Sequence, residues 1–229
     1  MTQIHIVTVH PQFIAAYSEF GVFRSAKNKK TVEIVPFNLR DVAADKHGTV
    51  DGAPFGGGDG MVLRPDVLKS AHEQLPEGIN IYTGPRGKPF SQKDADELAK
   101  MLVSGQNLNF YCGRFGGVDE RFLEKYIDRT YSLGDFVLSG GELPVLSICD
   151  AVLRLLPGVL GNDQSAEVDS FSEKLAGLLE APSYTKPRDF EGCTVPEVLL
   201  SGDHQRIDDW RKRLSQEITR ALRPDLFKA

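Results

Sequence analysis

Short apolar runs alternate with amphipathic segments along the first two thirds of the chain. The apolar runs predict buried strands, and they occupy residues 4–9, 32–37, 79–83, 108–111 and 129–132. Segments with an apolar residue every three or four positions predict helices, and they occupy residues 11–20, 65–74, 91–103, 119–127 and 143–156. Strands that alternate with helices indicate an α/β fold with a parallel sheet.

The segment Leu143–Leu156 differs from the other predicted helices because it is apolar almost all round. Its polar residues, Ser147, Asp150 and Arg154, form a single stripe. A helix of this composition is deeply buried or lies at a subunit interface. Arg154 is an unusual charge there, and it either pairs with Asp150 on a wet face or faces a binding site.

Three glycine-containing turns follow predicted strands, at Thr83–Gly87, Gly113–Gly117 and Gly134–Gly141. Ligands of open α/β sheets bind at the carboxyl ends of the strands, so these turns together predict a ligand pocket. A fourth glycine-rich stretch, Pro54–Met61, has no phosphate-loop signature. It is either a flexible loop or a loop that closes over a ligand.

The character of the chain changes after Gly161. Residues 162–170 are polar and predict a linker that orders on binding. Asp203 is a suitable N-cap for a helix that ends near Leu222, and Trp210 lies on the apolar stripe of this helix. We interpret Trp210 as a core residue rather than as a platform for base stacking.

Composition restricts the function and the location of the protein. The 229 residues carry a net charge of −5, which does not point to nucleic acid, although the arginines between Arg206 and Arg223 can form a local basic patch. Three cysteines without C-x-x-C spacing argue against disulfides and structural zinc, and they fit a reducing cytoplasm. The chain has no signal-peptide pattern and no apolar run long enough for a membrane span.

Several long motifs resemble the bacterial tRNA (guanine-N1)-methyltransferase (TrmD) family of knotted, SPOUT-type methyltransferases. Motifs in one fixed order along nearly the whole chain are more specific than any single signature. They are PFGGGDGMV at residues 54–62, CGRFGGVDER at 112–121, YSLGDFVLSGGELP at 131–144, DAVLRLLPGVLG at 150–161, PSYTKP at 182–187 and VPEVLLSGDH at 195–204.

The resemblance implies a parallel α/β sheet whose C-terminal part threads a loop to form a deep trefoil knot. Residues 1–160 would form the knotted domain that binds S-adenosylmethionine, and residues 161–177 a flexible interdomain linker. Residues 178–229 would form a small, mainly helical domain that binds tRNA. The family also implies a homodimer whose active site is shared between subunits, as would suit the apolar helix.

The activity implied is the transfer of a methyl group from S-adenosylmethionine to N1 of the guanosine just 3′ of the tRNA anticodon (G37). This tRNA modification supports maintenance of the reading frame and takes place in the cytoplasm. By the same resemblance, the methyl donor is bound by Tyr82, Thr83, Gly84, Pro85, Gly113, Phe115, Gly116, Gly117, Ser132, Leu133, Gly134, Asp135, Phe136, Leu138, Gly140, Gly141 and Pro144.

Two residues align with the catalytic groups of the family. Asp169 would remove the hydrogen of guanine N1, and desolvation would strengthen it as a base. Arg154 would stabilise the negative charge that develops on guanine O6. Sequence pattern alone would favour Asp169 as a solvated linker carboxylate.

The C-terminal residues would contact the anticodon stem-loop through phosphates or bases. The resemblance and the local basic character assign substrate contacts to Gly58, Ser165, Lys186, Arg188, Ser201, Gly202, His204, Arg206 and Arg211. Family members tend to need magnesium, but no side-chain cluster has the spacing of metal ligands, and the metal is left unassigned.

The chain also departs from the family pattern. Phe115 and Gly116 stand where tyrosine and glutamate are usual, Asp59 replaces a proline and Gly84 a serine. Since that glutamate lies near the amino-acid end of the donor, the group that anchors the donor's amine stays open, and another acid could substitute. The alternatives are a knotted methyltransferase acting on another RNA, and an inactive module that binds RNA or the donor.

Overall fold

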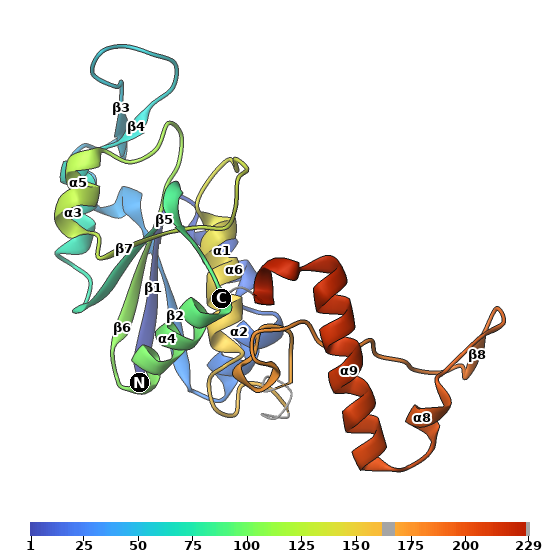
Figure 1. Cartoon of the computed structure of the whole chain (residues 1–229). Helices are drawn as coiled ribbons and strands as arrows, with labels where there is room; N and C mark the ends of the chain where they lie inside the picture. Colours follow the sequence, from blue (N-terminus) through green and yellow to red (C-terminus); the bar gives the residue numbers. More distant parts are fainter. Residues whose placement is uncertain (162–167, 228–229) are drawn as a thin grey trace. The chain divides into compact units, whose positions relative to one another are not determined.

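The computed structural model describes residues 1–161 and 168–227. The chain divides into two compact units, Met1–Gly161 and Asn162–Ala229. The first unit contains a five-stranded sheet in the order β2-β1-β6-β5-β7, and every strand pair in it is parallel. The predicted α/β fold with a parallel sheet is therefore confirmed (Figure 1).

The strands of this sheet are close to those that the apolar runs predict. They are β1 (Thr2–Thr8), β2 (Val32–Asn38), β5 (Gly78–Pro89), β6 (Asn107–Cys112) and β7 (Arg129–Ser132). A short hairpin, β3 (Asp51–Gly52) and β4 (Val62–Leu63), pairs separately from the sheet.

Helices cover both faces of the sheet (Figure 1). They are α1 (Pro11–Tyr17), α2 (Gly21–Asn28), α3 (Pro65–His72), α4 (Gln92–Val103), α5 (Glu120–Tyr126) and α6 (Glu142–Leu153), with a 3₁₀ turn η1 (Leu39–Val42). The α4 helix begins with a capping box, as the spacing of Ser91 and Asp94 predicts, and the two residues satisfy each other's backbone amides.

The alternation of side chains along each strand separates two hydrophobic cores. Ile6 and Phe110 point to the core that includes α1, α2, α4 and α6, whereas Val7 and Tyr111 point to the core that includes α3 and α5. Burial raises the pKa of the Cys112 and Cys149 thiols, so both remain protonated apolar groups.

Three local predictions were wrong. The segment predicted as one helix from 11 to 20 ends at Tyr17, and a further helix, α2, follows, with Phe23 and Ala26 buried beneath its charged residues. The predicted turn at Thr83–Gly87 lies inside β5, because pairing with β7 resumes at Lys88 after a bulge. The apolar pattern predicts no strand or helix between residues 38 and 63, where the structure has η1, β3 and β4.

The second unit is small and contains mostly helix and short turns. Its elements are η2 (Glu173–Leu175), the hairpin β8 (Asp189–Phe190) and β9 (Cys193–Thr194), α8 (Glu197–Leu200), α9 (His204–Leu222) and η3 (Pro224–Phe227). As predicted, the Asp203 side chain caps α9 by accepting a hydrogen bond from the Arg206 amide. In the described ranges, none of the helices combines the length and hydropathy needed to cross a membrane.

Candidate active site

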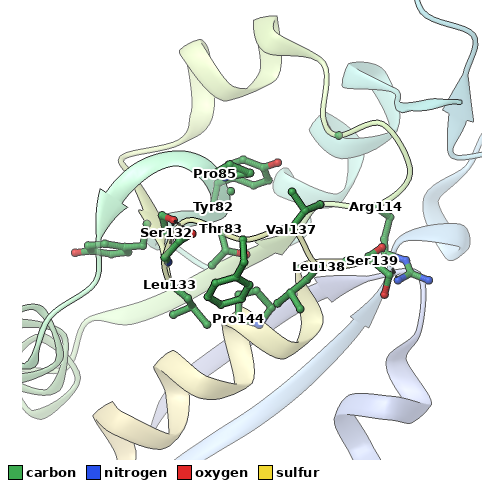
Figure 2. A pocket seen from close by; sticks show the side chains of 18 of the residues that line it. Tyr82, Thr83, Pro85, Arg114, Ser132, Leu133, Val137, Leu138, Ser139 and Pro144 are labelled. Carbon is green, nitrogen blue, oxygen red and sulfur yellow. Dashed lines mark hydrogen bonds between the residues drawn. The ribbon is translucent and has the colours of Figure 1, made fainter. Parts of the chain in front are cut away.

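The three glycine-containing segments meet around one cavity in the first unit. The cavity has a volume of about 280 Å³ and lies where β5, β6 and β7 lead into the turns (Figure 2). It is lined by Tyr82, Thr83, Gly84, Pro85, Gly113, Arg114, Phe115, Gly116, Gly117, Tyr131, Ser132, Leu133, Gly134, Phe136, Val137, Leu138, Ser139, Gly140, Gly141 and Pro144.

Nearly all the residues assigned to the donor by the family resemblance are therefore brought together. Asp135 is the exception, because it is exposed and lies outside the lining. Arg114, Tyr131, Val137 and Ser139 line the cavity but were missed by sequence reasoning. Their proximity in sequence to the glycine motifs was the available signal.

Backbone contact joins the turn after β6 to the turn before α6. The Gly141 amide donates to the Gly113 carbonyl at 2.8 Å, and an isolated bridge pairs Arg114 with Gly140. A Cβ atom on Gly141 would lie 2.7 Å from the Gly113 nitrogen and 2.8 Å from the Cys112 Cα. Because both neighbours are backbone atoms, only glycine fits this contact.

The lining combines apolar side chains with a few polar groups. Figure 2 shows Leu133, Leu138 and Pro144 on one side of the cavity, with Pro85 on the other. Thr83 Oγ1 and Arg114 Nε are buried without a hydrogen-bond partner. An apolar cavity with a small number of unsatisfied polar groups is typical of a small-molecule site.

Arg114 is the one charged side chain among the described residues that line the cavity. Its Nη1 donates to the Ser139 carbonyl at 2.9 Å, and its Nη2 donates to His10 Nε2 at 2.8 Å. The buried Glu142 carboxylate lies 3.9 Å from Arg114 Nη1 and accepts a hydrogen bond from the Thr8 hydroxyl. This network fixes the cavity wall to the end of β1 and the start of α6.

Gly116 connects the cavity to the β3–β4 hairpin. Its amide donates to the Met61 carbonyl at 2.6 Å, and a Cβ atom would lie 2.8 Å from that oxygen. Gly116 also lines a second, wider cavity of about 810 Å³ beside the hairpin. Gly58 lies in the hairpin's exposed loop. The glutamate that the family pattern would place at Gly116 would require the Met61 carbonyl to shift.

The two candidate catalytic residues belong to different units. Arg154 is half-buried and follows α6 as its C-cap, and Asp169 is half-buried in the second unit. Burial raises the pKa of the Asp150 carboxyl, and the neighbouring Arg154 opposes that rise. Their roles remain predictions.

Some of the residues predicted to contact tRNA gather in the second unit. Lys186, Arg188 and Arg211 line a common cavity there. Ser201, Gly202, His204 and Arg206 lie on the exposed turn between α8 and α9 and on the first turn of α9. Ser165 lies outside the described residues.

The chain was compared with known proteins. Residues 2–229 match the family model described as tRNA (Guanine-1)-methyltransferase TrmD. The tRNA (guanine-N(1)-)-methyltransferase of Pelagibacter ubique is 48% identical over 100% of this chain and 98% of its own length. The enzymes of the same name from Dictyoglomus turgidum and Staphylococcus carnosus are 45% and 44% identical, over 100% and 98% of this chain and 91% and 90% of their own lengths. This chain therefore belongs to the TrmD family of tRNA (guanine-1)-methyltransferases.

Proposed function

We propose that this protein transfers a methyl group from S-adenosylmethionine to N1 of G37, the guanosine just 3′ of the anticodon in tRNA. The observation that carries the proposal is the cavity at the ends of β5, β6 and β7, in a chain that matches the family from residue 2 to residue 229. An enzyme of this type needs one site for the donor and a second surface that presents the guanine.

The residues of the cavity fit an adenosine that carries an amino-acid end. Leu133, Leu138 and Pro144 offer an apolar surface to the adenine ring. The partnerless Thr83 Oγ1 and Arg114 Nε offer hydrogen bonds, and Arg114 offers positive charge to a carboxylate. The amine is left to backbone carbonyl groups of the turns, because among the described lining residues no side chain is acidic.

In the proposed reaction, Asp169 takes the N1 proton of the guanine, and the electron pair left on N1 is shared as negative charge with guanine O6. When bound, S-adenosylmethionine would supply a sulfonium methyl group to that N1 electron pair, and the C–S electron pair would stay on sulfur. The guanidinium of Arg154 stabilises the negative charge on O6. Orientation of both reactants by the cavity and the tRNA surface supplies much of the remaining acceleration.

The family's assembly also belongs to this proposal. Exposed apolar side chains on the cavity turn and on α6, namely Phe136, Val137, Leu138 and Leu143, suit a subunit interface and support a homodimer. The deep trefoil knot is proposed from the family match over residues 2–229. We place the enzyme in the cytoplasm, where tRNA is modified.

Magnesium is not given a role. Among the described residues, no group of three or more His, Cys, Asp or Glu side chains could hold a metal ion. We therefore derive no step of the reaction through magnesium.

The test is methyl transfer from labelled S-adenosylmethionine to tRNA transcripts with G or A at position 37. We expect label on the G transcript alone, at N1. The variant Asp169→Asn should lose about 10²- to 10⁴-fold in kcat, the range typical of a missing general base. It should still bind S-adenosylhomocysteine.

Two outcomes would contradict the proposal. Label on the A transcript would indicate a different target atom or RNA. Absence of label from a protein that binds both S-adenosylhomocysteine and tRNA would indicate an inactive binding module.

A further inference from the structure

A cavity in the second unit is separate from the proposed donor site. Its volume is about 550 Å³, and it lies between the segment 181–188 and the helices α8 and α9. Its lining residues all belong to the second unit. They are Ala181, Pro182, Ser183, Tyr184, Thr185, Lys186, Arg188, Val195, Leu199, Leu200, Ile207 and Arg211.

The charged residues that line this cavity are all basic. Lys186, Arg188 and Arg211 line it, and no described lining residue is acidic. Arg188 pairs with Glu197 at 3.0 Å and Arg211 with Asp208 at 3.8 Å, but all four of these side chains are more than half exposed. Exposed ion pairs contribute little free energy, so a phosphate can replace these carboxylates at small cost.

The rest of the lining is apolar and partly uncovered. Leu199 and Ile207 are half-buried, whereas Leu200 and Tyr184 are 44% and 48% exposed. The Tyr184 ring lies 6.3 Å from the half-buried Trp210 ring, measured between centroids, at an interplanar angle of 55°. Trp210 thus supports Tyr184 from within the unit, while part of the tyrosine stays open to a ligand.

We infer that this cavity receives one unstacked nucleotide of the tRNA substrate, with its base against Tyr184 and the apolar lining and a phosphate beside Lys186, Arg188 and Arg211. The inference rests on the proposed function and specifies how the second unit holds the RNA. Sequence-tolerant recognition of unpaired RNA combines aromatic stacking with cations that follow the backbone. A paired base cannot offer its face to a side chain, so the occupant comes from the loop of the stem-loop.

The experiment measures whether the loss of the Tyr184 side chain and the loss of one RNA base affect the binding affinity independently. If the base stacks on Tyr184, the two losses are coupled and do not add. A series of anticodon stem-loops, each with one abasic position in the loop, is titrated against the full-length wild type and against Tyr184→Ala, without the methyl donor. At one position, we expect the abasic change to weaken wild-type binding on the order of tenfold, as loss of one stacked base does. The same change should have no effect on Tyr184→Ala.

Two further variants separate stacking from folding. Tyr184→Phe keeps the ring and should keep the coupling. Phe190→Ala removes another exposed aromatic residue of this unit, outside the cavity lining, and should keep the coupling as well.

The variant Arg188→Gln tests the phosphate contact. It should lower the slope of log affinity against log salt concentration by about one, as expected for the loss of one phosphate contact.

Equal losses for the wild type and Tyr184→Ala at every abasic position would overturn the inference. In that case, continued methylation of the G37 transcript by the wild type would leave the proposed function intact. Tight binding of a phosphopeptide in place of the stem-loop would also overturn it. A wild type that neither binds nor methylates tRNA would refute both proposals.

Discussion

The two cavities differ in what builds their walls. The proposed donor cavity is formed by turns that backbone contacts hold together, and it lies beside two cores of buried hydrophobic side chains. The cavity of the second unit is formed mostly by exposed side chains, with half-buried ones such as Leu199 and Ile207 among them. Among the described residues of that unit, Ser215 and Thr219 are the buried ones, and both are polar.

This difference indicates how each site tolerates change. Where two backbone segments touch, as at Gly141, an added methyl group must displace main-chain atoms. A wall made of exposed side chains can lose one of them while its neighbours stay in place. We therefore expect large losses from substitutions at the backbone contacts of the proposed donor cavity, and graded, salt-dependent losses at the cavity of the second unit.

The largest effect is expected from Gly141→Ala. The new Cβ would meet the Gly113 nitrogen and the Cys112 Cα, both within 3 Å. Overpacking against backbone costs about 3 kcal/mol of folding free energy. Relief of this strain moves apart the turns that form the cavity, so we expect a loss of roughly 100-fold in donor affinity. Calorimetric titration with S-adenosylhomocysteine measures this loss.

Gly161→Ala is the matched control, because a Cβ at Gly161 would meet no atom within 4 Å. Its donor affinity should stay within about twofold of the wild type. Equal affinities for Gly141→Ala and Gly161→Ala would show that the close contact between the turns does not define the donor cavity.

A smaller effect is expected from Gly116→Ala. The methyl group would lie 2.8 Å from the Met61 carbonyl, which belongs to a loop that can move more easily than a strand. We expect a cost of about 1–2 kcal/mol, or roughly tenfold in donor affinity. Unchanged affinity would show that the Met61–Gly116 hydrogen bond does not hold the cavity rim.

The smallest effect concerns the stability of the first unit. Burial alone would raise the pKa of the Asp94 carboxyl, but hydrogen bonds from Lys88 and Ser91 outweigh burial and hold it below its usual value. The charged form therefore stabilises the fold above the usual Asp pKa, and this contribution is lost as the pH falls through the lowered pKa.

Asp94→Asn should lower the free energy of unfolding by about 1 kcal/mol at pH 7, as expected for the loss of a helix cap. The difference from the wild type should shrink in acid. Urea titrations at several pH values measure it, with Asp96→Asn on the same helix as the control. A difference that grows in acid would contradict the assigned network.

Much of the first unit could be predicted from the sequence because its signals are local. The apolar runs, the capping box at Ser91 and the glycine turns all depend on residues close together in the chain. The helix α2 was missed because its few buried residues, such as Phe23, lie among charged ones. The bulge in β5 was missed because it depends on pairing with β7, which is distant in sequence.

The site was predictable to the extent that motifs are continuous. The glycine turns indicated the cavity of the first unit, but the network that joins Arg114 to His10 and Glu142 spans three elements and leaves no local pattern. The cavity of the second unit likewise combines Tyr184 with residues as distant in sequence as Arg211. Side chains that meet only through tertiary folding require the structure.

The most direct test of whether the two sites are separate is to measure the binding of each ligand alone to a variant of each site. Affinities for S-adenosylhomocysteine and for the anticodon stem-loop are measured on folded Gly141→Ala and Tyr184→Ala. We predict that Gly141→Ala loses donor affinity and keeps RNA affinity, whereas Tyr184→Ala shows the reverse. Equal loss of both ligands in either variant would contradict the assignment of separate donor and RNA sites.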